Sequence, residues 1–408
     1  MMDGSYEYLS GSATIPATAP EQWKKGEIHE FYARPNDQEW GEKLCRVLFH
    51  ESLHFWQFLS SGYIASLVAE DWEHLVHFEK KGEIKPYSEK LKNFRVKQNF
   101  AFSSYNLVEC IARYWDVHTR NANKIIEKEK IEIDKNKVYA ADMGLSTPVY
   151  TEHAFDTVMQ FGEDCQLYAE PYRWMLKQSK NDSYFTNSVF PAIASFAFLT
   201  EKPVEVFCES FSMALKSNKL KKKLNDVGRK SRMQIHAAWY ESYHDVLEIV
   251  SETVNYMSLP KLKLGIDIIG EQLQSHPIFK EFPTKITNML GNIKFDSVTV
   301  TLPPYSQHIL QMAISDLHVV FTFFGEPDFR YYLGRALHPP KIIFQNFTIF
   351  ANRPVQTKLA KFFNSTTKGD DYGDNYEKHY VELEDRIKNF RNAQAKDAYE
   401  ISKDHLKK

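Results

Sequence analysis

Apolar residues recur at helical spacing along most of the first 260 positions of the chain. The runs end at turn-forming or charged residues, such as Ser60-Ser61-Gly62 and Lys80-Lys81-Gly82. A basic segment near the end of this region is predicted to be a surface turn, at residues 216–232. The remaining pattern predicts helices over residues 37–59, 63–80, 103–130, 153–176, 189–200, 203–215 and 233–257.

The pattern changes after Pro260. Residues 294–302 alternate between apolar and polar with a period of two, and residues 341–350 form a second strand-like run. Residues 309–324, between these two runs, have the composition of a buried helix. From residue 366 the chain turns polar and then becomes a charged helical segment. These features predict a smaller mixed α/β portion toward the C-terminus.

The pattern therefore divides the chain into four parts. Residues 1–20 are small and polar, and we expect them to form a flexible arm. The other parts are a helical domain, a mixed α/β portion, and a polar linker with a charged C-terminal helix, at residues 21–260, 261–365 and 366–408. The predicted fold class is mainly α, with a multi-helix core and a smaller mixed α/β portion.

Composition agrees with helical packing and gives the chain no strong electrostatic field. Aromatic residues make up 14% of the 408 positions and only 16 residues are Gly, which suits bulky helix packing better than a turn-rich β-sandwich. The net charge is -2, so no global field attracts nucleic acid or an anionic membrane. The basic segment at 216–232 lacks interleaved aromatic residues, and we interpret it as a solvated face.

The cysteines and the apolar runs predict a cytoplasmic protein without a membrane partner. The longest apolar runs, 189–199 and 319–324, are too short to span a bilayer. The first six residues lack the basic and apolar regions of a signal peptide. The four cysteines are far apart, form no Cys-x-x-Cys pair and read as buried free thiols of a reducing compartment: Cys45, Cys110, Cys165 and Cys208.

The most informative motif is His50-Glu51-x-x-His54, inside the helix predicted at 37–59. On a helix this spacing places two imidazoles one turn apart on one face, with a carboxylate beside them. The surrounding residues are apolar on every side, so the helix is expected to be buried. Buried imidazoles and carboxylates need compensation, which a metal ion would supply. The alternative is a pair of core histidines hydrogen-bonded to backbone or tyrosine.

A catalytic zinc site usually has three protein ligands, so a third must come from elsewhere in the chain. The HExxHxxGxxH arrangement is excluded, because no third His follows the motif. Glu109 is an acidic residue on an otherwise apolar helical face and is the preferred candidate. Glu209 competes with it, and Asp116 and His118 are candidates either as ligands or as partners that orient a ligand imidazole.

An HExxH motif followed by a Glu on a later helix resembles the gluzincin type of metallopeptidase. This resemblance covers residues 40–120 and implies a zincin-like core in which His50, His54 and Glu109 bind zinc. It further implies that Glu51 is the general base that takes a proton from zinc-bound water. Gln57 gives the variant HExxHxxQ, which is similar to uncharacterised bacterial proteins that carry a later Glu-x-x-Ala helix.

The resemblance implies a zinc-dependent hydrolase, in the simplest case a metallopeptidase that acts on a peptide or protein substrate. Residues that could stabilise the negative charge on the substrate oxygen are not ranked by the sequence: Tyr114, His153, His236 and Tyr240.

Two other functions use the same residues. Glu51-x-x-His54 and Glu241-x-x-His244, with Glu109 and Glu209, supply the ligand types of a di-iron or di-manganese helix-bundle oxygenase. The order of these motifs departs from the ferritin-like alternation and leaves His50 without a role. The second alternative is a non-catalytic helical interaction protein with a structural metal.

Overall fold

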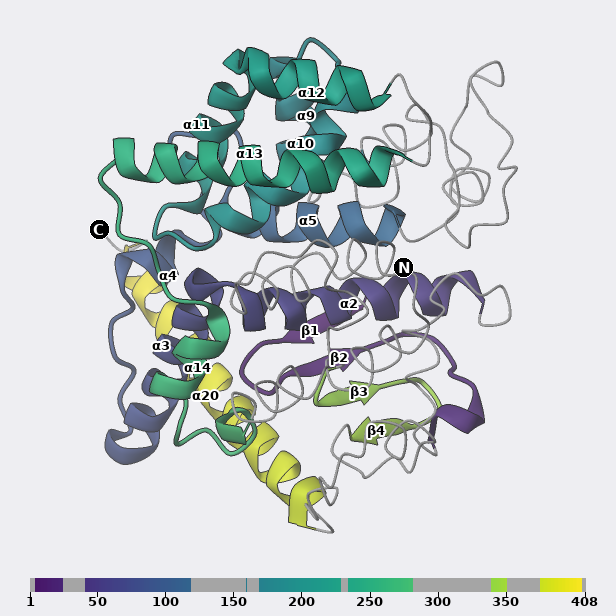
Figure 1. The fold of residues 1–408 in the computed structure, drawn as a ribbon. Coiled ribbons are helices and arrows are strands. Elements are labelled where there is room, and N and C mark those ends of the chain that lie inside the picture. The colour runs from purple at the N-terminus through teal and green to yellow at the C-terminus, as the bar shows by residue number, and fades with distance from the viewer. Residues whose placement is uncertain are drawn as a thin grey trace.

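The computed structural model describes residues 4–24, 41–118, 159, 169–228, 234–281, 339–350 and 375–405. Within these residues the chain is mainly helical, with one small four-stranded sheet, which confirms the predicted fold class. Helix α2 (Glu42–Ser60) runs through the middle of the molecule (Figure 1). The sheet lies on one side of it and α5 (Ser104–His118) on the other.

The other helices surround this centre in two groups. Helix α3 (Gly62–Lys81) follows α2 directly and packs with α14 (Gly265–Gln272). The second group lies beyond α5 and consists of α9 (Glu170–Gln178), α10 (Ser183–Ala197), α11 (Pro203–Lys216), α12 (Asn218–Gly228) and α13 (Gln234–Tyr256). The short elements are α4 (Glu89–Asn93) and the 3-10 turn η4 (Phe279–Glu281).

Helix α12 shows that the prediction of a surface turn in the basic segment was wrong. The basic segment that contains it was expected to be a surface turn, but residues 218–228 form a helix. Leu220 and Leu224 are buried four residues apart, while Lys221 and Lys222 are exposed. The lysines therefore form the solvated face of an amphipathic helix, and among the described side chains of α12 its apolar stripe consists of Leu220 and Leu224.

The sheet joins the N-terminal segment to residues 341–350, far along the chain. Its strands lie in the order β1 (Ser5–Glu7), β2 (Ser12–Thr14), β3 (Lys341–Ile343) and β4 (Thr348–Phe350). Strand β2 pairs in parallel with β3, with Ala13 opposite Ile342. The expectation of a flexible arm at residues 1–20 is therefore wrong for its described part, because a distant strand supplies the backbone partners.

The strand-like run at 341–350 is also divided differently from the prediction. It forms a hairpin of β3 and β4 rather than one continuous strand. Asn346 at the turn donates from Nδ2 to Ala19 O (2.9 Å) and accepts from Ala19 N at Oδ1 (3.0 Å). The predicted strand at 294–302 and the predicted helix at 309–324 lie outside the described residues.

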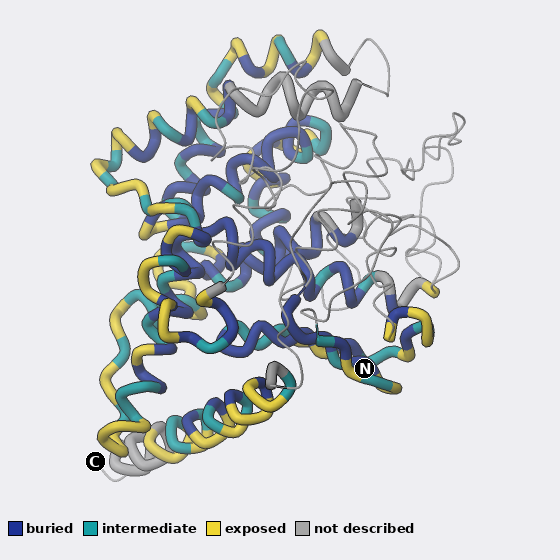
Figure 2. Tube along the Cα trace, turned by 60° about the horizontal axis from the view of Figure 1, so that its bottom comes forward, coloured by how far each residue is buried: buried dark blue, intermediate teal, exposed yellow. Residues whose placement is uncertain are grey.

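Helix α20 (Asn375–His405) confirms the charged C-terminal helix. Exposed and buried residues alternate along it, so that one face packs against the molecule and the other meets solvent (Figure 2). Cys110 and Cys208 are buried free thiols, as predicted. The side chains of Cys45 and Cys165 are not among the described ones. Across the described ranges, no helix combines the length and the apolar character needed to cross a membrane.

The junction between α2 and α3 depends on close backbone contacts. Ser61 caps α3 by accepting from Ile64 N (3.0 Å), and its hydroxyl donates to Phe198 O (3.2 Å). Gly62 and Gly265 pack so tightly that a Cβ atom at either position would overlap a backbone carbonyl, that of Lys263 or Phe58. This contact fixes the end of α2 against α14.

Replacing Gly62 by Ala tests this junction. Because the obstructing atom is backbone and cannot rotate away, we expect the free energy of unfolding to fall by about 1–3 kcal/mol in urea titrations. Glu73→Ala, an exposed change in the same helix, should alter it by no more than about 0.5 kcal/mol. A Gly62→Ala variant as stable as wild type would contradict the close packing.

His276 ties the segment after α14 to the N-terminal turn. Its Nε2 donates to Leu9 O (2.7 Å), and its Nδ1 accepts from Ile278 N and Phe279 N (both 3.1 Å). Burial lowers the pKa of His276 to about 3, so the ring is neutral in the folded protein.

Acid is therefore expected to weaken the fold through His276. Its pKa rises from about 3 when folded to 6.5 when unfolded, so the contribution to stability is complete above pH 6.5 and falls as pH drops toward 3. The slope is up to about 1.4 kcal/mol per pH unit in urea titrations at several pH values. His276→Gln should reduce the slope, and His379→Gln, at an exposed site, should not. Equal slopes in all three proteins would contradict the role of His276.

Candidate metal centre

The three residues predicted as metal ligands meet between α2 and α5. His50 Nε2 and His54 Nε2 lie 3.3 and 3.4 Å from the same oxygen, Oε2 of Glu109. Ligand atoms of the three residues are all within 4.8 Å of one another, and the described residues contain no second cluster of this kind. The side chains of His50, His54 and Glu109 are 12%, 5% and 9% exposed.

The helix positions the two imidazoles. His50 and His54 are four residues apart on α2, so they lie on one face, with ring centroids 5.0 Å apart and planes at 83°. Gln57 then connects this face to α5. Its Oε1 lies 3.0 Å from His54 Nδ1, and its Nε2 donates to Val108 O (2.9 Å), the residue before Glu109.

This network defines the protonation of His54. The carbonyl oxygen of Gln57 can only accept, so the proton of the neutral His54 ring is assigned to Nδ1. The lone pair of Nε2 then faces Glu109. An imidazole oriented through its second nitrogen in this way is typical of metal ligands.

The spacing of the donor atoms fits a zinc ion. Two ligands held at about 2.0–2.1 Å from a tetrahedral ion lie roughly 3.3–3.4 Å apart. The separations of Glu109 Oε2 from His50 Nε2 and His54 Nε2 have this length. Two imidazole nitrogens and one carboxylate oxygen are also a ligand set that catalytic zinc sites use. The residues present therefore fit the metal.

The three groups also shift one another's protonation. Burial lowers the pKa of His54, but the adjacent charge of Glu109 outweighs it and raises the pKa to about 9. Burial raises the pKa of Glu109, yet the charge of His54 and the hydrogen bond from His50 hold it well below its usual range. Glu109 is therefore ionised, the form in which a carboxylate binds metal, while a proton on His54 competes with the metal.

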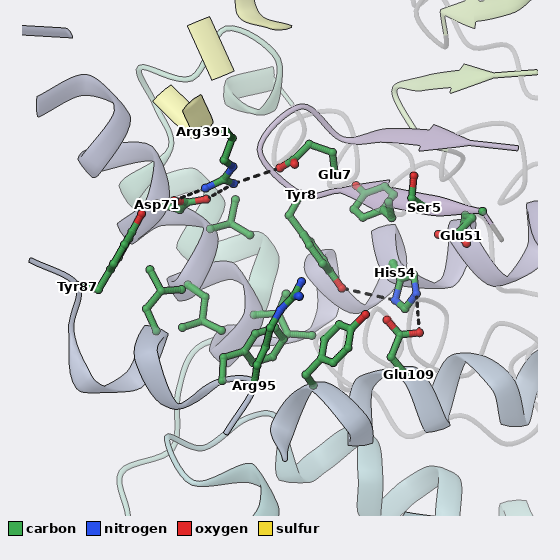
Figure 3. Close-up of a pocket in the computed structure, with 18 of the residues that line it drawn as sticks. Ser5, Glu7, Tyr8, Glu51, His54, Asp71, Tyr87, Arg95, Glu109 and Arg391 are labelled. Atoms are coloured by element: carbon green, nitrogen blue, oxygen red, sulfur yellow. Dashed lines mark hydrogen bonds and ion pairs between the residues drawn. The ribbon is translucent and has the colours of Figure 1, made fainter. Parts of the chain in front are cut away.

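Glu51 lies beside the three donors rather than among them. It is the next residue after His50 on α2, is 4% exposed and lines the same cavity. Figure 3 shows its carboxylate beside Ser5 at the start of β1. The backbone at Gly4 approaches so closely that a Cβ atom there would overlap Val47 and meet Glu51 Oε1 at 2.5 Å. The N-terminal strand therefore packs directly on the predicted base.

The donors occupy one end of a cavity of about 550 Å³. At the opposite end, the Arg391 guanidinium binds Asp71 through two contacts (2.5 and 3.0 Å) and Glu7 through one (3.4 Å). The lining also includes five apolar side chains, those of Ile64, Leu67, Val68, Leu91 and Phe94. The volume and the mixture of an apolar wall with a few polar groups are typical of small-molecule and peptide sites.

Two tyrosines at the metal end were missed by the sequence analysis. The Tyr8 hydroxyl is 3.5 Å from His54 Nδ1, as Figure 3 shows. Burial, together with the nearby charge of Glu109, raises the pKa of the Tyr105 hydroxyl. The position of Tyr105, four residues before Glu109 on α5, is a signal that could have identified it. Tyr8 had no such signal, because its segment was expected to be flexible.

The other candidates do not join the cluster where they can be placed. Glu209 is half-buried on α11 and is not part of the group of donors. Asp116 forms a buried ion pair with Arg113 (3.2 Å). Tyr114 donates its hydroxyl to Asn187 O (2.9 Å), away from the donors. The side chains that lie outside the described ones are His118, His153, His236, Tyr240, Glu241 and His244.

Comparisons with protein-family models, with curated proteins and with solved structures find no match to this chain.

The arrangement predicts one metal ion per chain. After zinc loading and dialysis, mass spectrometry should find about one zinc per wild-type chain. His50→Ala, His54→Ala and Glu109→Ala should each lose it, because two remaining ligands hold the ion far more weakly. Glu209→Ala and Glu241→Ala are the matched controls and should keep it. Zinc that survives Glu109→Ala but not Glu209→Ala would reverse the assignment of the third ligand.

Proposed function

We propose that this protein is a zinc-dependent hydrolase that cleaves amide bonds in peptides. The observation that carries the proposal is the convergence of His50, His54 and Glu109 on one cavity, with Glu109 Oε2 3.3 and 3.4 Å from the two imidazoles. The carboxylate of Glu51 lines the same cavity. A metal-binding triad and an adjacent base are the two components that this chemistry needs.

One group of side chains would hold the metal, and another would transfer protons. Zinc held at this triad would supply Lewis-acid activation of water. Glu51, next to His50 on the helix, accepts the proton from the attacking water and passes it to the leaving amine. Gln57 keeps the His54 ring turned so that its Nε2 faces the metal position.

Tyr8 and Tyr105 place two hydroxyl groups at the same end of the cavity. Both are protonated at neutral pH, because burial raises their pKa values. A neutral phenol donates a hydrogen bond and can stabilise negative charge that develops on the carbonyl oxygen. Among the described side chains they are the best-placed candidates for that role, since Tyr114 donates its hydroxyl to Asn187 O. The other three donors considered from the sequence, His153, His236 and Tyr240, lie outside the described side chains.

The cavity is the reason to prefer a catalytic metal over a structural one. A structural zinc site is closed by four protein ligands, whereas a catalytic site keeps a position for water or substrate. The described donors number three, and all three line the open cavity. The apolar side chains of its wall offer contacts for a hydrophobic peptide side chain. A peptide is therefore the substrate class that we propose.

The substitution Glu51→Gln separates binding from chemistry. It removes the base but keeps the size of the side chain, so zinc should be retained while hydrolysis of a fluorogenic peptide library falls by about 100-fold to 10,000-fold. Glu73→Gln, an exposed change on α3, should leave both unchanged. Full hydrolytic activity in Glu51→Gln would show that the assigned mechanism is wrong.

A further inference from the structure

Arg95 lines the same cavity and belongs to no ion pair in the described part of the chain. It lies in the connection between α4 and α5, is exposed, and stacks its guanidinium carbon 4.6 Å from the ring centre of Tyr105. In Figure 3 its side chain lies near Tyr8, between Arg391 on one side and His54 and Glu109 on the other.

The other two cations that line the cavity have acidic partners. Arg391 is held by Asp71 and Glu7 at the far end. Lys92 lies 2.8 Å from Glu89, and both side chains are more than half exposed. Arg95 is thus the cavity cation whose hydrogen-bonding groups are available to a ligand. A guanidinium offers paired N–H groups that match the two oxygens of a carboxylate.

The backbone around Arg95 is fixed from both sides. Tyr105 N donates to Phe94 O (3.0 Å), which fastens the connection to the start of α5. On the other side, Lys97 forms an ion pair with Glu170 of α9 (2.6 Å). With the ring of Tyr105 beneath the guanidinium, these contacts position Arg95 before a ligand arrives. Such preorganisation lowers the entropic cost of binding.

The position of Arg95 limits where a ligand group can lie. Tyr105 lies between the two sites, because its ring contacts Arg95 and it stands one turn before Glu109 on α5. Residues one turn apart on a helix are neighbours, so the guanidinium lies on the order of 10 Å from the Glu109 carboxylate. An extended peptide spans about 3.3–3.6 Å per residue, so a group held by Arg95 is about two or three residues from the bond at the triad.

We propose that Arg95 binds a carboxylate group of the substrate, so that the preferred peptides carry an acidic group two or three residues beyond the cleaved bond. The carboxylate comes either from the C-terminus of a short peptide or from an acidic side chain. This inference rests on the proposed function for the cleavage step, but the binding of the carboxylate is measured separately from turnover.

The test uses zinc-loaded protein with Glu51→Gln, so that peptides bind without being cleaved. Fluorescence anisotropy compares three probes: dansyl-Gly-Gly-Phe with a free carboxylate, the same peptide as its amide, and dansyl-Gly-Phe-Asp amide. At least one carboxylate probe should bind about 10-fold more tightly than the neutral amide. Adding Arg95→Gln should remove this ratio, and Arg95→Lys should keep part of it. Lys85→Gln, an exposed change outside the cavity lining, is the control and should keep it fully.

The results distinguish a C-terminal carboxylate from an acidic side chain as the group that binds. They also distinguish failure of the role of Arg95 from failure of the proposed hydrolase function. Preference for the free carboxylate alone identifies the C-terminus, and preference for both carboxylate probes identifies any nearby acidic group. Preference for the aspartate probe alone identifies an acidic side chain. Equal binding of all three probes, no binding of any, or a ratio that survives Arg95→Gln would overturn the role of Arg95. If wild-type protein cleaves peptides without this preference, only the role of Arg95 fails. If the preference exists without cleavage, the proposed function fails instead.

Discussion

The burial of two imidazoles and a carboxylate between α2 and α5 is the constraint on which this structure depends. Helix α2 packs in apolar surroundings along residues 44–59, so His50 and His54 lie at the end of a cavity, only 12% and 5% exposed, rather than on an outer face of the molecule. Ionised groups that are removed from water are tolerated only when they are paired or bind a metal. Glu109 meets both rings, and Gln57 joins α2 to the backbone of α5 one residue earlier. The polar contacts thereby set the register of the two central helices.

Local sequence patterns alone could predict that His50, His54 and Glu109 lie together, because each pattern reflects a physical requirement that acts locally. The all-round apolar character of residues 44–59 required a buried helix, and Gly82, in the left-handed conformation, ends α3 as expected. The spacing of His50 and His54 fixed their shared face without any tertiary information. Glu109 could be named because it is an acidic residue on an apolar face, a placement that requires a partner.

Long-range pairing accounts for what the sequence did not reveal. Residues 5–14 look like a flexible arm by composition, and their strands exist because β3 pairs with β2 from far along the chain. Tyr8 reaches His54 only through that pairing, so its place at the site could not be predicted. In α12 the error was local, since two buried leucines did not outweigh the lysine run in the pattern. Tertiary pairing thus explains the N-terminal strands and Tyr8, whereas α12 was misjudged from its local pattern.

X-ray absorption at the zinc edge of the loaded wild-type protein would show whether His50, His54 and Glu109 coordinate zinc. We expect a first shell of nitrogen and oxygen only, at about 2.0–2.1 Å, with the outer-shell scattering of two imidazole rings. A sulfur neighbour at about 2.3 Å, or an oxygen shell without imidazole scattering, would place the metal elsewhere and contradict coordination by these residues.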